Sequence, residues 1–507
     1  MMKQKRVLSF MLALLLLCGA LTACAEVDQG EEPQTDAKPV ASEQEETGET
    51  ELRDRLPDDL NYGGDEIVFI SRYREGWSSG ELTVEGLNDE TVNDAVYERN
   101  LAVEQRLGVR IKNIEINTSD YDEVANKVKL AVQGGSKEYD VMASPVNGTV
   151  PVMLTGTLAD LRKMEYIDFA KPWWSQGFNE TAEYGGAQFA ATGSMVLSMY
   201  RFAFVTVFNQ RLFTEANQTF LYDYVENDTW TLDQQISLVP LFHHDNGNGK
   251  QDPEDDVYGF ITGNLISVDP YWSSCEISIL ARDEDSGFVM DFDSSKLHDV
   301  MDKVLKLYYG TDDGTYVYKN YGYDDEQIDI RDAFAAGYGA MATLRILELE
   351  NEVMRSMTDK YGVVPMPKYD KSQKDYRTFL HNQFTVLSVP STVEEGRRSE
   401  IGAVLEALAS ESYRVVRPAY YETTLRTKLA QDSQSAEMME IVANNVYMDE
   451  GVFYSRQLDD FYKYPRTVVQ ANQNDIASHY AGLKRKFNRF LKDLVEDLDY
   501  FSSGTSA

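Results

Sequence analysis

The chain has 507 residues, and its 84 aspartates and glutamates against 48 lysines and arginines give a formal net charge of −36. A surface this acidic repels phosphate backbones and anionic lipid headgroups, so nucleic acid is excluded as an expected partner. Beyond the N-terminus, no apolar run is long enough to span a bilayer as a helix.

The N-terminus has the pattern of an export signal. Basic residues from Lys3 to Arg6 precede an apolar run from Val7 to Leu17, which is too short for a membrane-spanning helix. The following Leu21-Thr22-Ala23-Cys24 resembles the bacterial lipobox, in which the cysteine thiol receives a diacylglycerol and the chain is cleaved before it. We therefore expect residues 1–23 to be a lipoprotein signal peptide and Cys24 to anchor the protein at the extracellular face of the cytoplasmic membrane. The alternative is an ordinary secretory signal with an incidental cysteine.

Residues 24–60 join the expected lipid anchor to the body of the chain. They are acidic and contain almost no apolar side chains, so they cannot bury enough surface to offset the entropy of ordering. We expect a disordered tether. Once the signal is removed and Cys24 is acylated, Cys275 has no disulfide partner, so the body must be held together by its hydrophobic core.

The body begins with alternating strands and helices. The pattern predicts strands over 67–70, 109–116 and 139–143, with helices over 91–107 and from about 121 to a stop at Gly134. A strand–helix–strand–helix–strand order predicts an α/β fold with a parallel sheet covered by helices.

Ligands of such sheets bind beyond the carboxyl ends of the strands. This rule selects the loop after the first strand, which carries Arg74 and Trp77, and the loop after the third, which carries Asn147. Neither loop has the glycine-rich pattern that cradles phosphates, so a nucleotide site is not indicated. Each of the three residues has a structural alternative, as part of the core or of the surface.

Six segments follow one another in order along the chain. They are Leu87 to Val109, Ile167 to Trp174, Phe208 to Phe213, Trp230 to Asp233, Tyr361 to Asp370 and Pro418 to Glu422. Together they resemble the family 1 extracellular solute-binding proteins. The resemblance implies a type II periplasmic-binding fold, with two α/β lobes joined by hinge strands that close on a ligand. It implies an N-terminal lobe of residues 61–202 and 376–414 and a C-terminal lobe of residues 203–375 and 415–500.

The resemblance also implies a function. Proteins of this family deliver a captured small molecule, often a carbohydrate, to the permease of an ABC importer. We expect a monomer. The 31 Tyr, 22 Phe and 5 Trp of the chain favour a carbohydrate as its ligand, and the tandem aromatic residues favour an oligosaccharide in particular. Sugar rings pack their C–H faces on aromatic side chains, while their hydroxyls hydrogen-bond to polar groups.

Further candidate ligand-binding residues lie in three segments. Tyr271 and Trp272 follow a proline and are candidates for stacking on a sugar ring. Arg345 follows an apolar run, where the family often places a ligand loop, and Tyr420 and Tyr421 are candidates to line the cleft. The alternatives are core packing for the aromatic residues and a surface ion pair for Arg345.

The segment from His244 to Asp255 resembles a calcium loop of the EF-hand type. His244 departs from the pattern, because the first position normally carries an aspartate and imidazole is a poor ligand for a hard cation. We expect a possible structural Ca²⁺ site, and the alternative is a metal-free turn. The ligands would be Asn246, Asn248, Lys250 through its carbonyl, Asp252 and Asp255.

The main rival interpretation is a secreted glycoside hydrolase, which needs two carboxylates at a defined separation. A chain with 84 acidic residues always offers some such pair, so this criterion decides nothing. The sequence has no Gly-x-Ser-x-Gly or His-Glu-x-x-His motif. We therefore expect a binding protein rather than an enzyme, with no required cofactor. A surface adhesin or peptide-binding lipoprotein is the third alternative.

Overall fold

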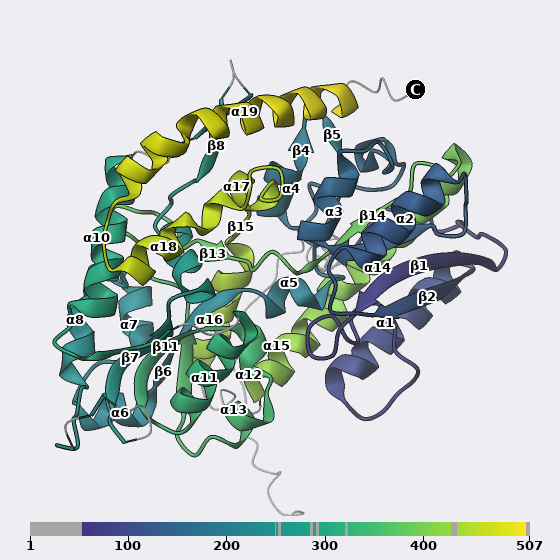
Figure 1. The fold of residues 1–507 in the computed structure, drawn as a ribbon. Helices are drawn as coiled ribbons and strands as arrows, with labels where there is room; N and C mark the ends of the chain where they lie inside the picture. Colours follow the sequence, from purple (N-terminus) through teal and green to yellow (C-terminus); the bar gives the residue numbers. More distant parts are fainter. Residues whose placement is uncertain are drawn as a thin grey trace, which may run out of the picture. The chain divides into compact units, whose positions relative to one another are not determined.

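Figure 1 shows a computed structural model that describes residues 53–502, except 249, 252–254, 284–286, 291–293, 320–322 and 427–432. The expected signal peptide, Cys24 and the expected tether up to residue 52 lie outside these described residues. Among the helices that the structure describes, none is both long and apolar enough to cross a membrane.

The first sheet has four strands in the order β14-β3-β1-β2. Strands β1 (Asp65–Tyr73), β2 (Val109–Asn117) and β3 (Val141–Pro145) run parallel, which confirms the predicted α/β arrangement. Strand β14 (Thr385–Ser388) comes from much later in the chain and pairs antiparallel with β3. We call this sheet and its helices the first lobe.

Helix α1 (Thr91–Leu107) has the predicted bounds. Its buried face includes Val96, Val103 and Leu107, which recur at helical spacing. Gly108 ends the helix in the left-handed conformation, with φ of 61°, and its N–H bonds back to the carbonyl of Glu104. Helix α2 (Glu123–Gln133) follows β2, likewise as predicted.

The second sheet has five strands in the order β10-β7-β11-β6-β12 and defines the second lobe. Strand β7 pairs parallel with β10 and β11, whereas β6 pairs antiparallel with β11 and β12. Its strands are β6 (Phe204–Asn209), β7 (Tyr258–Gly263), β10 (Thr315–Tyr318), β11 (Gly339–Arg345) and β12 (Tyr361–Val364).

Helices cover both sheets (Figure 1). In the first lobe α14 packs beside α1, and in the second α11 packs on β11 while α10 packs on α8. The remaining α-helices are α3 (Val146–Met153), α4 (Gln176–Ala182), α5 (Leu197–Arg201), α6 (Gln210–Glu215), α7 (Leu221–Glu226), α8 (Leu232–Leu238), α9 (Asp269–Ser274), α10 (Ser295–Tyr309), α11 (Tyr323–Ala335), α12 (Ile346–Leu349), α13 (Glu352–Ser356), α14 (Glu395–Glu411), α15 (Arg417–Arg426), α16 (Ser433–Asn444), α17 (Glu450–Phe453), α18 (Tyr464–Ala471) and α19 (Ile476–Ser502).

Short elements complete the described chain. They are the two-stranded sheets of β4 (Glu183–Tyr184) with β5 (Ala187–Gln188), β8 (Leu280–Asp283) with β9 (Gly287–Met290) and β13 (Thr378–Phe379) with β15 (Val446–Tyr447), the 3-10 helices at Leu161–Lys163, Val239–Leu241, Ile266–Val268 and Phe461–Lys463, and a π-helical turn at Ser412–Val416.

The last helix, α19, is 27 residues long and contacts segments of both lobes. In its first half, Tyr480 and Phe487 pack on Phe461, with ring centroids 6.3 and 4.2 Å away. Near its end, Asp499 accepts a hydrogen bond from the hydroxyl of Tyr184, and the ring of Phe501 lies against Gly156. Figure 1 shows α19 running from α10 toward β4 and β5.

The expected tether extends too far toward the C-terminus. Residues 53–60 pack on the first lobe, where Leu56 is buried and Asp54 pairs with the guanidinium of Arg106 at 2.7 and 2.8 Å. Composition alone missed this contact because Leu56 and Leu60 are the only two leucines in residues 53–60, which are otherwise charged apart from Pro57. Cys275 is a free, buried cysteine, as expected, and burial raises the pKa of its thiol to about 12.

Candidate ligand-binding site

Side chains of the two lobes meet around a pocket of about 380 Å³. The loop after β1 supplies Arg74, Glu75, Gly76 and Trp77. The second lobe supplies residues from α11, the end of β11, α12 and α13. The structure therefore brings together three of the predicted site residues, Arg74, Trp77 and Arg345, and it places the first two beyond the carboxyl end of a strand as the sequence predicts.

Trp77 is half-buried at the centre of a group of arginines. The guanidinium carbon of Arg74 lies 3.4 Å from the ring centroid, and those of Arg345 and Arg72 lie at 5.2 and 5.8 Å. Phe202 meets the ring edge-on at 4.9 Å. The indole therefore holds several cations by cation–π attraction.

Arg345 is the last residue of β11 and is only 2% exposed, so it does not form the surface ion pair considered as the alternative. Its Nη2 donates to Glu348 at 2.7 Å, and its Nη1 lies 3.4 Å from Nδ1 of His381. Its Nε–H is buried and has no hydrogen-bond partner. A buried donor without an acceptor costs about 1–3 kcal/mol.

The segment 381–383, between β13 and β14, lies against both lobes. The N–H of His381 donates to the carbonyl of Phe202. Gln383 accepts from the guanidinium of Arg72 at 3.2 and 3.3 Å. Sequence reasoning missed Arg72 and this segment, although Arg72 stands only two residues from Arg74, because their roles depend on contacts between residues about 310 apart in the sequence.

The pKa of His381 is well below its ordinary value because the ring is buried and is faced by cations. The charges that act on it are those of Arg345, Arg466, Lys463 and Arg74. Burial disfavours the imidazolium form, and each neighbouring positive charge disfavours it further. His381 is therefore neutral at physiological pH and adds no charge of its own.

Asn147 lies in the first turn of α3, close to the same segment. Its N–H donates to the carbonyl of Asn382 at 3.3 Å. Its side-chain oxygen is buried without a hydrogen-bond partner. Asn147 is thus placed at the junction of the lobes, but it does not line the pocket described above.

Tyr271 and Trp272 do not fit the predicted role of sugar-stacking residues. Both are fully buried in α9, where Pro270 occupies the first turn instead of forming an exposed loop. The hydroxyl of Tyr271 hydrogen-bonds to Thr343, and Trp272 packs against Phe379 at 5.5 Å. They belong to the core of the second lobe, which was the alternative interpretation.

Tyr420 and Tyr421 also pack in the interior and do not line the pocket. Both rings contact Tyr200. The hydroxyl of Tyr420 donates to Glu350, which in turn accepts from Arg201 at 3.2 Å. Tyr420 therefore supports the pocket through its hydrogen bond to Glu350.

The predicted calcium loop is described only in part, since Gly249 and Asp252 lie outside the described residues. The amide oxygens of Asn246 and Asn248 accept the backbone N–H groups of Asn248 and Lys250, at 2.8 and 2.7 Å. Over the described residues, no cluster of three or more His, Cys, Asp or Glu could hold a metal ion. Ca²⁺ binding stays a prediction.

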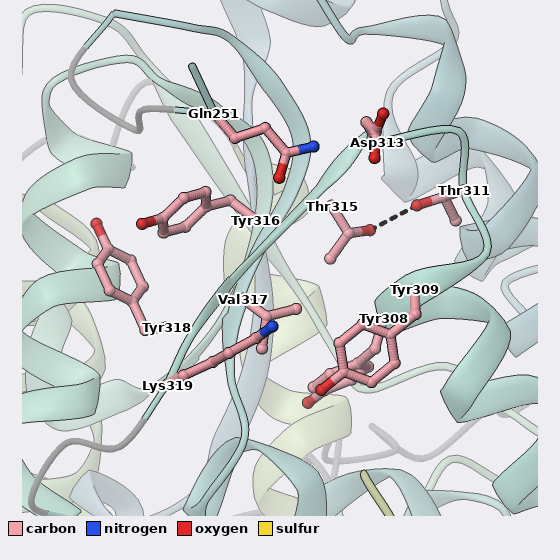
Figure 2. A pocket seen from close by; sticks show the side chains of 10 residues that line it. All are labelled: Gln251, Tyr308, Tyr309, Thr311, Asp313, Thr315, Tyr316, Val317, Tyr318 and Lys319. Carbon is pink, nitrogen blue, oxygen red and sulfur yellow. Dashed lines mark hydrogen bonds between the residues drawn. The ribbon is translucent and has the colours of Figure 1, made fainter. Parts of the chain in front are cut away.

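A second pocket, of about 410 Å³, lies at the edge strand β10 (Figure 2). Tyr316 and Tyr318 line it with ring centroids 4.9 Å apart, and the ammonium of Lys319 lies 5.5 Å from the ring of Tyr309. All of its lining residues belong to the second lobe. It is therefore not the place where the two lobes meet.

No protein-family profile and no curated protein matches the chain. Solved structures do match. The ABC substrate-binding protein from Listeria monocytogenes in complex with cycloalternan is 14% identical, with a TM-score of 0.52 over 87% of this chain and 99% of that one. The GacH receptor of Streptomyces glaucescens, solved unliganded and with acarbose, is 14% identical, with a TM-score of 0.54 over 85% and 99%.

UgpB from Mycobacterium tuberculosis in complex with glycerophosphocholine is also 14% identical, with a TM-score of 0.51 over 85% of this chain and 100% of that one. At these identities the likeness concerns the fold. The chain has the two-lobed α/β fold of the solute-binding proteins of ABC transporters.

Proposed function

We propose that this protein captures a carbohydrate between its two lobes and delivers it, chemically unchanged, to the permease of an ABC importer. The observation that carries the proposal is the pocket in which Trp77 of the first lobe meets Arg345 of the second. The fold supports it, because solute-binding proteins with this fold were solved with cycloalternan and with acarbose.

The mechanism of capture follows from the placement of the pocket. A ligand that contacts both lobes binds more tightly to the arrangement in which both sets of contacts form, and so it favours that arrangement. The first lobe supplies Arg74 and Trp77, and the second supplies Arg345. The protein acts as a monomer in this scheme, and the liganded form is the one that docks on the permease.

The test is a thermal-shift and calorimetric screen of the chain from residue 25 onward, against oligosaccharides, amino acids and peptides. A ligand at a hundredfold excess over its dissociation constant stabilises the folded state by about 2.7 kcal/mol. We expect stabilisation by a carbohydrate. Stabilisation by peptides alone would overturn the carbohydrate assignment, and turnover of a chromogenic glycoside would overturn the assignment as a binding protein.

We also propose that a diacylglycerol on Cys24 holds the protein at the outer face of the cytoplasmic membrane. The motif Leu21-Thr22-Ala23-Cys24 supports this. In a bacterium fed a labelled fatty acid, the wild-type protein should carry the label and sediment with membranes. The Cys24→Ser variant should lose both properties, and labelling of that variant would contradict the proposal.

We further propose that Ca²⁺ acts as a structural clip in the loop containing Asn246, Asn248, Lys250, Asp252 and Asp255. The amide and carboxylate oxygens of this set suit a hard cation. Ca²⁺ should raise the melting temperature of the wild-type protein but not that of an Asn248→Ala variant. An equal shift in both proteins would place the ion elsewhere.

A further inference from the structure

The second pocket lies along the open edge of the second sheet. Its lining includes every residue from Thr315 to Lys319, so the pocket follows strand β10. Among the described strands, β10 pairs only with β7, which leaves its other edge open. The volume of about 410 Å³ lies within the range of about 300–1,000 Å³ that is usual for small-molecule sites.

The backbone of β10 presents polar groups along this edge. The N–H of Asn264, just after β7, donates to the carbonyl of Tyr318 at 3.2 Å, so the backbone of Tyr318 faces β7. In a parallel ladder, successive residues of a strand direct their backbone groups to opposite sides. The backbone groups of Val317 and Thr315 therefore point away from β7, where they offer a ligand donors and acceptors in fixed positions.

Aromatic rings supply the apolar part of the lining. Tyr309, Tyr316 and Tyr318 are half-buried and line the pocket. The hydroxyl of Tyr309 donates to the carbonyl of Val469 at 2.9 Å, which fixes the orientation of its ring. The rings of Tyr316 and Tyr318 meet at 74° with centroids 4.9 Å apart. Aromatic rings held beside polar groups match a sugar, which has both apolar C–H faces and hydroxyls.

Three exposed polar side chains complete the lining. Gln251, Asp313 and Lys319 come from separate segments of the second lobe and surround the strand, as Figure 2 shows. Together they supply an amide, a carboxylate and an ammonium group, which can both donate to and accept from hydroxyls. Asp313 and Lys319 are the only charged residues in the lining, so its net charge is zero. The pocket therefore matches a neutral, polar ligand.

An extended peptide is the other ligand that an open strand edge can take, by adding a strand to the sheet. Strand β10 has only four residues and is followed by Lys319. Short edge strands and lysines at the edge both oppose the addition of a further strand. A carbohydrate needs separate contacts to its hydroxyls and no long ladder, so it fits this edge better.

We propose that the pocket at β10 is a second carbohydrate-binding site, which takes a neutral oligosaccharide. The rings of Tyr309 and Tyr316 pack on the sugar, and its hydroxyls bond to the open edge of β10, to Asp313 and to Lys319. All of these residues belong to the second lobe, so this binding needs no movement of one lobe toward the other. The inference goes beyond the proposed function and does not depend on which ligand the two lobes hold between them.

Two substitutions at Tyr309 separate the ring from its hydroxyl. Tyr309→Phe and Tyr309→Leu both lose the hydrogen bond to Val469, but only the second loses the aromatic ring. The chain from residue 25 onward and both variants are applied to an array of neutral oligosaccharides, and calorimetry gives the affinity for each sugar that binds. At this site we expect Tyr309→Leu to weaken binding roughly tenfold and Tyr309→Phe to change it less than about twofold.

A double variant tests the polar contacts without touching the interior. Gln251→Ala with Lys319→Ala changes only exposed side chains, so the fold should be retained. It should weaken binding of the same sugars by roughly fivefold or more. Trp77→Ala is the control, since Trp77 lines the other pocket and its loss should leave the affinity of this site unchanged.

The outcomes separate this inference from the proposed function. If every bound sugar kept its affinity in Tyr309→Leu and in the double variant, the second site would be refuted and the proposed function would stand. Equal losses in Tyr309→Phe and Tyr309→Leu would refute stacking on the ring. Extended peptides that bound in place of sugars, and lost affinity in Tyr309→Leu, would overturn the carbohydrate assignment. Binding of no neutral sugar at all would overturn this site as well.

Discussion

Trp230 and Trp77 show how differently the cores and the junction of the two lobes are built. Trp230 is fully buried in the apolar core of the second lobe, and its indole N–H donates to the carbonyl of Pro365 at 2.8 Å. Trp77 is half-buried, and it contacts Arg74 and Arg345 at the pocket. One tryptophan fills space in a closed interior, whereas the other contacts charged side chains that line a pocket.

The largest expected effect on stability belongs to the core tryptophan. Trp230→Ala removes a fully buried indole and leaves a cavity, so we expect the free energy of unfolding to fall by about 3–5 kcal/mol. Urea denaturation followed by circular dichroism measures this loss. A loss below about 1 kcal/mol would show that this core is not closely packed.

Removal of residues 53–60 should have the next largest effect. A chain that begins at residue 61 loses the buried side chain of Leu56 and the pair between Asp54 and Arg106. We expect it to be less stable than a chain that begins at residue 53 by about 2 kcal/mol, from burial of one leucine and a partly exposed ion pair. Equal melting temperatures of the two forms would show that this segment is only a tether.

Two buried carboxyl groups in the interior should make stability depend on pH. Burial raises the pKa of Asp449 to about 7 and that of Glu450 to about 8, although Glu450 pairs with Arg282 at 2.6 Å. The folded state therefore binds more protons than the unfolded state between about pH 4 and pH 8. The free energy of unfolding should fall over this range as pH rises, by up to about 1.4 kcal/mol per pH unit for each group.

The Glu450→Gln variant removes one of these titrations and keeps an acceptor for Arg282. Its free energy of unfolding should depend less steeply on pH than that of the wild type between pH 5 and pH 8. Urea titrations at a series of pH values measure both slopes. If the free energy of unfolding changed equally with pH in the variant and the wild type, Glu450 would be ionised in the folded protein over this range.

The smallest expected effect on stability belongs to the tryptophan of the pocket. Trp77→Ala should lower the free energy of unfolding by less than about 1.5 kcal/mol, because the side chain is only partly buried. It should nevertheless weaken ligand binding by roughly tenfold or more, because Arg74 loses its cation–π support. Unchanged ligand affinity of this variant would show that Trp77 is not part of the ligand-binding site.

Elements that depend on local pattern were predictable from the sequence. Helix α1 was predicted with its observed bounds, because its apolar residues recur at helical spacing and Gly108 supplies the left-handed stop. Strands β1 to β3 were predicted by short apolar runs between polar turns. The α/β class of the fold follows from the order of these elements.

Side-chain roles that depend on distant contacts were predicted less well. Arg74 and Trp77 were found because a strand end is a local signal. Tyr271 and Trp272 were assigned to a ligand site because their turn looked exposed, whereas α9 is buried by parts of the chain far away in sequence. His381 could not be found, because nothing near it in the sequence reveals the arginines that face it.

The C-terminal helix has a mechanical consequence. At 1.5 Å per residue, α19 is about 40 Å long, and it is held near its start by Phe461 and near its end by Tyr184 and Gly156. Such a rod resists stretching, so it acts as a brace on the side of the molecule that it crosses. A rotation of one sheet relative to the other must therefore take α19 as its axis or displace the C-terminal end of the helix. Such a displacement would move the ring of Phe501 across Gly156.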